Sequence, residues 1–138
     1  MRVIRLASIA GLMALSACQT ATASAPAADC PIIGSSDWTA WVDAMPGPNS
    51  HPKLVVTGKV QVPTGGYRLA LHLGPVAESY PVQVTVILDV VRPTGPASQA
   101  IVTHDVNGSW PVASPIGSIT IRCGRQMIGR IDEIVTAL

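Results

Sequence analysis

The chain is poor in aromatic and charged side chains. Its 138 residues include no Phe, only 4% aromatic residues and only 12% charged residues. Without Phe, a hydrophobic core has to be built mainly from Val, Ile and Leu. The few charges form no run of either sign, which argues against the basic patch that nucleic-acid binding requires. The same scarcity argues against electrostatic attachment to anionic lipids.

Turn-forming residues are abundant by contrast. Twelve Gly and twelve Pro in so short a chain indicate many turns and few long helices. Alternating polar and apolar residues predict strands, in the segments 54–62, 67–73, 82–91, 99–106 and 118–123. Residues 38–44 are also β-prone, although Ser36-Asp37 can instead cap one helical turn. Residues 128–135 fit either a last strand or a short helix.

Loops are expected between these segments. Asn107-Gly108 is the strongest short hairpin signal, and its return strand is soon interrupted by Pro111 and Pro115. The other expected turns cover residues 45–49, 63–66, 74–79 and 92–97. Six to seven short strands with frequent turns predict an all-β fold, namely an antiparallel β-sandwich. An immunoglobulin-like arrangement is the natural version of it.

The N-terminal stretch has the pattern of a secretory signal. Arg2 and Arg5 precede an uncharged apolar run from Leu6 to Leu15, and the small residues Ser16-Ala17 follow before Cys18. The run is too short for an ordinary membrane-spanning helix, which needs about 20 apolar residues.

Leu15-Ser16-Ala17-Cys18 resembles the lipobox of bacterial lipoprotein precursors. The resemblance implies a signal peptide over residues 1–17 and lipidation (palmitate) of Cys18, which becomes the first mature residue and anchors the protein to a membrane. Residues 18–29 then form a flexible tether, and residues 30–138 form the β-sandwich domain. The residue that follows Cys18 is Gln19 and not an aspartate. By resemblance to proteobacterial lipoproteins, this implies sorting to the outer membrane, facing the periplasm.

The three cysteines can now be assigned. If Cys18 carries lipid, Cys30 and Cys123 remain as a pair in an oxidising compartment, which predicts a disulfide between them. Closing a loop of about ninety residues contributes about 4–5 kcal/mol in the chain-entropy picture. Two buried free thiols are the alternative.

No constellation for metal binding or catalysis stands out. His51, His72 and His104 each stand alone, without His-x-His or Cys-x-x-Cys spacing, whereas a copper or zinc site needs three or four converging ligands. Each histidine is therefore expected to face solvent or to make a single hydrogen bond. Met45 and Met127 add only isolated thioethers.

Catalytic motifs are missing as well. There is no G-x-S-x-G elbow and no phosphate loop. On a strand, His104 and Asp105 point to opposite faces, which does not suit a histidine oriented by its aspartate. The adjacent Asp132-Glu133 is expected to be a solvated surface pair. We therefore expect no enzymatic activity, no cofactor and no metal.

Three tryptophans are the candidates for partner contact. On a strand, Trp38 and Trp41 face opposite sides, so one can fill the core while the other stays exposed beside the loop Met45–His51 as a binding anchor. Core packing of both is the alternative. Trp110 either packs across its hairpin and stabilises it or makes a further contact with a partner.

These observations favour a lipid-anchored envelope protein whose β-sandwich is a binding or structural module for an envelope protein partner. The alternative is a periplasmic protease inhibitor or chaperone-like protein, which presents the loop Met45–His51 or an edge strand to its target. Metal handling is a third hypothesis.

Overall fold

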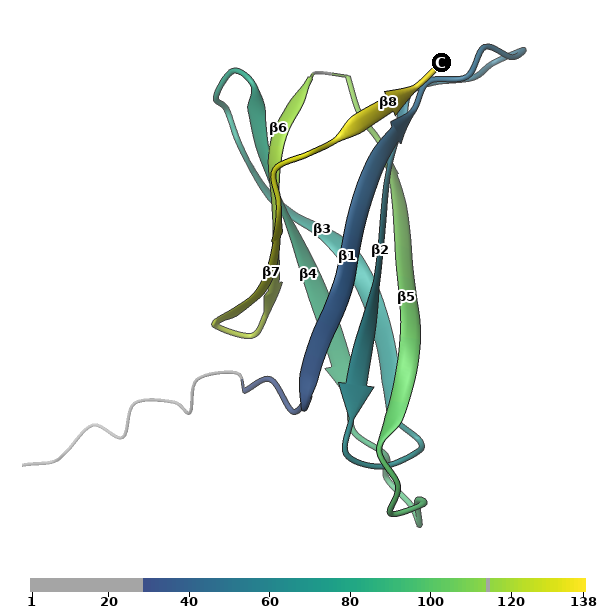
Figure 1. The fold of residues 1–138 in the computed structure, drawn as a ribbon, viewed down its shortest axis with the longest axis vertical. Coiled ribbons are helices and arrows are strands. Elements are labelled where there is room, and N and C mark those ends of the chain that lie inside the picture. The colour runs from purple at the N-terminus through teal and green to yellow at the C-terminus, as the bar shows by residue number, and fades with distance from the viewer. Residues whose placement is uncertain (1–28, 114) are drawn as a thin grey trace, which may run out of the picture.

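The computed structural model describes residues 29–113 and 115–138 (Figure 1). The predicted signal peptide, Cys18 and the tether up to residue 28 lie outside the described residues. Within the described part, all regular structure is strand, and no helix is long and apolar enough to cross a bilayer. The strands are β1 (Gly34–Asp43), β2 (Lys53–Val62), β3 (Arg68–Ala77), β4 (Val82–Val91), β5 (Val102–Pro111), β6 (Ile116–Cys123), β7 (Gln126–Ile131) and β8 (Val135–Ala137).

The strands form two packed four-stranded sheets. One has the order β5-β2-β1-β8 and the other β3-β4-β6-β7 (Figure 1). The prediction of an all-β sandwich is confirmed, with eight strands instead of six to seven. The prediction of purely antiparallel pairing is wrong, because β1 pairs with β8, and β4 with β6, in parallel. Both pairs arise because the chain crosses to the other sheet and returns, and they depart from the two antiparallel sheets of the expected immunoglobulin-like arrangement.

The core lies between the sheets and follows the alternation in the sequence. On β2, Leu54, Val56, Val60 and Val62 are completely buried. The buried residues form two clusters. The first consists of Ala40, Leu54, Val56, Val84, Val86, Ile119, Ile121 and Ile131. The second consists of Val60, Val62, Leu88, Val106 and Cys123. Because Phe is absent, these clusters depend on aliphatic packing.

Trp38 joins the two clusters, since its indole packs against both. A Cβ atom added at Gly58 would overlap the indole, and one added at Gly129 would lie 2.6 Å from its Cδ1 atom. The ring is therefore held between β2 of one sheet and β7 of the other. Its Nε1 donates to Ser35 Oγ at 3.0 Å, and Ser35 Oγ donates to the carbonyl of Ile128 at 2.9 Å. These bonds connect β1 to β7.

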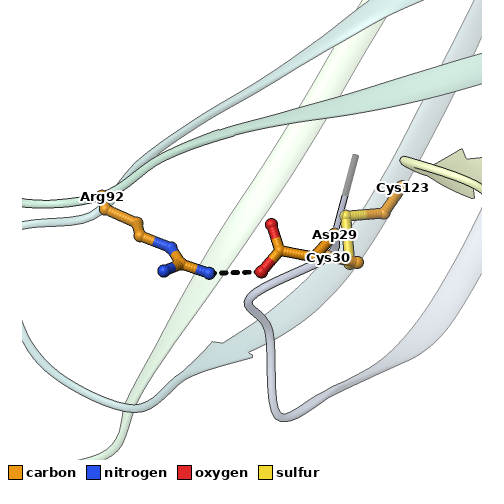
Figure 2. A network of polar contacts seen from close by, with 4 residues as sticks. All are labelled: Asp29, Cys30, Arg92 and Cys123. Atoms are coloured by element: carbon orange, nitrogen blue, oxygen red, sulfur yellow. Dashed lines mark hydrogen bonds and ion pairs between the residues drawn. A yellow bond between two sulfur atoms is a disulfide. The ribbon is translucent and has the colours of Figure 1, made fainter. Parts of the chain in front are cut away.

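The end of the sandwich at which the described chain begins, called here the entry end, is closed by a covalent bond. The predicted disulfide between Cys30 and Cys123 is confirmed, with 5.3 Å between the Cα atoms. Beside it, Arg92 Nη2 donates to Asp29 Oδ2 at 2.6 Å (Figure 2). The bridge therefore holds the first described residues against the end of β6.

The predicted Asn107-Gly108 hairpin is wrong. Both residues lie inside β5, where they pair with Thr57 and Val56 of β2. A Cβ atom at Gly108 would overlap the indole of Trp110 two residues further along the same face. The glycine therefore makes room for the indole within a continuous strand.

Two further segments differ from the prediction. The expected turn at residues 74–79 begins later, because β3 continues to Ala77 through an irregularity between Leu73 and Val76. Residues 128–135 are neither one strand nor a helix, because they include most of β7, a connection and the start of β8. Of the β-prone segment 38–44, residues 38–43 are strand, as part of β1, and Ala44 follows the strand.

Candidate binding site

A groove that we call the tryptophan groove runs between β1 and β7, beside β8. It has a volume of about 540 Å³. Its lining residues are Trp38, Thr39, Ala40, Trp41, Arg130, Ile131, Asp132, Glu133 and Val135. They come from two parts of the chain that are about ninety residues apart in the sequence.

The groove exists because β1 is covered unequally on its two sides. Along one side β1 pairs with β2 from Gly34 to Asp43, but on the other side β8 pairs only with Trp41, Val42 and Asp43. The rest of that side faces β7, the edge strand of the opposite sheet. After Ile131 the chain leaves β7 and crosses to β8, and this crossing forms one wall of the groove.

The two tryptophans of β1 have different environments. Trp41 lies on the outer face of its sheet, opposite Val55 and beside Val135, and is 37% exposed. Trp38 points inward and is partly buried. The prediction that they face opposite sides is confirmed, and both line the groove because its wall curves around the free edge of β1.

Trp110 takes a different place. It is half-buried on the inner face of β5 and packs against the first core cluster. It is not among the residues that line the tryptophan groove. Trp110 does not stabilise a hairpin, because the predicted hairpin at Asn107-Gly108 does not form.

The groove also carries charged groups. Arg130 Nε donates to both carboxylate oxygens of Asp132, at 2.9 and 3.2 Å. Glu133 follows on the same wall. The groove thus offers indole surface together with carboxylate acceptors and a guanidinium donor. This set of groups suits recognition of a ligand by stacking and hydrogen bonding.

The histidines lie apart from the groove. His72 Nδ1 is 2.6 Å from Asp89 Oδ2 in an exposed pair on the outer face of the β3–β4 sheet. His51 lies in the loop before β2. His104 departs from expectation, because it faces inward opposite Val60 and its buried Nε2 has no partner among the described residues. In the described part of the chain, no three His, Cys, Asp or Glu side chains are placed to hold a metal.

Two apolar cavities lie at the end opposite to the entry end, called here the far end. Their volumes are about 370 and 190 Å³, and both contact Val112, Ala113 and Ile116. The nearby loop Met45–His51 folds on itself, since the backbone N–H and Oγ of Ser50 both donate to the carbonyl of Gly47. Compared with the tryptophan groove, the two cavities are lined by fewer polar side chains.

Comparisons of the chain with protein-family models, with curated proteins and with solved structures found no match. The groove is therefore interpreted from its own geometry. The sequence pointed to Trp38 and Trp41, but it gave no sign that Arg130 and Val135 lie beside them, and Asp132-Glu133 was expected to be only a solvated pair. No local pattern carries this information, because the groove depends on the pairing of the last strand with the first.

Proposed function

We propose that the protein is a non-enzymatic, lipid-anchored envelope protein that binds its partner in the tryptophan groove. The lipobox-like sequence ending at Cys18 supports the anchor. The disulfide between Cys30 and Cys123 supports an oxidising compartment outside the cytoplasm. With Gln19 after the cysteine, the proposed location is the outer membrane, with the domain in the periplasm.

The main support for a binding role is that Trp38 and Trp41 line the same groove as Asp132 and Glu133. Indole rings provide large, rigid contact areas, and partly exposed tryptophans are frequent centres of binding energy. Polar groups at the margin fix the orientation of a bound molecule. We propose an envelope protein as the partner.

The anchor is tested by metabolic labelling with radioactive palmitate. The wild-type protein incorporates the label, and Cys18→Ala does not, because lipid attachment requires the thiol. Cys30→Ser is the matched control, since it removes a cysteine that the anchor does not use. Label retained in Cys18→Ala would overturn the lipoprotein assignment.

The groove is tested by photo-crosslinking in intact cells. A photoreactive amino acid at Glu133, on the groove wall, is compared with one at Ser109 on the outer face of β5. We expect a discrete crosslinked band from position 133 that Trp41→Ala abolishes, and none from position 109. Equal crosslinking from both positions contradicts the binding role of the groove.

The protease-inhibitor or chaperone-like alternative predicts a different surface. The loop Met45–His51 would then carry the contact, and it lines a separate cavity of about 280 Å³ with Lys53 and Pro111. Shortening this loop would abolish the crosslink or the capture of a protease. Under our proposal, the shortened loop leaves the crosslink from position 133 in place.

A further inference from the structure

Folding gathers cations that are scattered along the sequence. Seven of the nine Lys and Arg residues follow Cys18. Four of these seven lie at the entry end of the β3-β4-β6-β7 sheet, two on its strands and two in the loops that follow β4 and β6. They are Arg68, Arg92, Arg122 and Arg125. Because no two of them are closer than three positions in sequence, the chain shows no basic run.

The strand register places two of these side chains, those of Arg68 and Arg122, on the outer face of the sheet. Arg122 lies between the buried Ile121 and Cys123 on β6, so its own side chain points outward. It pairs with Met127 of β7, and its Nη2 donates to the carbonyl of Arg125 at 2.8 Å. Arg68 likewise points outward.

Exposed apolar side chains accompany the arginines. Arg68 pairs with Val91, which is 54% exposed. Met127 is 57% exposed, and Ile33, which lines the same small cavity as Met127, is 51% exposed. We call this surface, formed by the four arginines with Ile33, Val91 and Met127, the entry face.

Two carboxylates border the entry face, and each has a partner. Asp29 accepts a hydrogen bond from Arg92, as Figure 2 shows, and Asp89 lies against His72. Within the described residues, Arg68, Arg122 and Arg125 have no carboxylate within salt-bridge distance. The surface therefore keeps an excess of positive charge.

We propose that the entry face docks onto the surface of an anionic lipid bilayer. The inference rests on the proposed lipid anchor, which explains why this face is near a membrane. From Cys18 to Asp29 the chain spans at most about 40 Å when fully extended, and Asp29 borders the entry face, where it accepts the hydrogen bond from Arg92. Arginines pair with lipid phosphates, and the exposed apolar side chains enter the interface beside them. The domain would thus lie against the membrane with a fixed face, and the far end would point away from it.

The test uses the chain from Gln19 onward without lipid, which contains all eight strands and the disulfide. Its partitioning is measured onto vesicles of phosphatidylcholine alone and onto vesicles with equal parts of phosphatidylglycerol. We expect binding only to the anionic vesicles, and we expect it to fall as salt is raised. Removing one arginine of the entry face weakens binding about fivefold, so Arg68→Gln with Arg125→Gln weakens it about 25-fold.

Lys53→Gln with Lys59→Gln is the matched control, because it removes the same charge from β2 of the other sheet. Met127→Ser tests the apolar part and should weaken binding without changing its salt dependence. Equal losses from the two charge pairs, or equal binding to both vesicles, would overturn the proposal. Since this chain carries no lipid, the result is independent of palmitate labelling, so failure of the anchor and failure of the docking face are told apart.

Discussion

The two ends of the sandwich are closed in different ways. At the entry end, the disulfide, the Asp29–Arg92 pair and a backbone hydrogen bond from Gly65 to Ser98 join separate segments. At the far end the sheets diverge, as Figure 1 shows, and cavities of about 370 and 190 Å³ lie there. Leu73 is 37% exposed there and Val76 47%.

This difference shows how a small core without Phe is stabilised. Aliphatic side chains fill the space where the sheets are close, and a covalent bond holds them together at one end. Where the sheets diverge, Val, Ile and Ala are too small to fill the gap, which leaves the cavities of about 370 and 190 Å³. Trp38 lies between the closely packed part and the diverging part, and it contacts both core clusters.

Removing Trp38 would uncouple the two ends of the sandwich, because its indole contacts both core clusters. We expect Trp38→Ala to destabilise the fold by about 4 kcal/mol, since it leaves a large cavity between the sheets. Urea denaturation measures the change. Trp110→Ala is the matched control and should cost less, because that indole contacts only the first cluster. Equal losses would show that Trp38 has no joining role.

Removing the disulfide would make the entry end resemble the far end. We expect Cys30→Ser with Cys123→Ser to lower the free energy of unfolding by about 2–4 kcal/mol, because the unfolded chain regains its conformational freedom. Limited proteolysis should then cut near Asp29 while the sheets remain. Mass spectrometry of the unreduced, alkylated protein provides the direct check. Alkylation of both thiols in protein purified from cells without a reductant would contradict the bridge.

The smallest effect is expected at the far end, where Ile116 begins β6, and Ile121 further along the same strand gives the matched comparison. Ile121 is completely buried, and Ile116 lines both far-end cavities. We expect Ile121→Ala to cost about 3 kcal/mol and Ile116→Ala about 1 kcal/mol, because the partly buried Ile116 side chain loses less burial. Thermal unfolding of both variants provides the measurement. A similar loss at the two positions would mean that the far end is packed as tightly as the middle.

Features set by local pattern could be predicted from the sequence. The alternation in Leu54–Val62 predicted a strand. Because Cys18 was expected to carry lipid, the two remaining cysteines predicted the disulfide between Cys30 and Cys123. The hairpin at Asn107-Gly108 was wrong because the dipeptide also fits a strand in which Trp110 covers the glycine. The turn preference of one dipeptide contributes less to stability than the pairing of ten residues of β5 with β2.

Features set by distant pairing could not be predicted. The parallel pairs β1–β8 and β4–β6 depend on which strands meet after the chain has crossed between sheets. For the candidate site, the sequence indicated Trp38 and Trp41, but the other wall, from Arg130 to Val135, follows from the position of β8. The same limit explains why four separated arginines gave no sign of a common surface.

The combination of the disulfide with the parallel β1–β8 pair has a mechanical consequence. Force applied between the proposed membrane anchor and β8 would load the β1–β8 hydrogen bonds in shear, because the two strands run in the same direction. If this contact yields, the bridge between Cys30 and Cys123 passes the load directly into the end of β6. Only the chain after Cys123 can then be drawn out, and the six strands before it bear no tension.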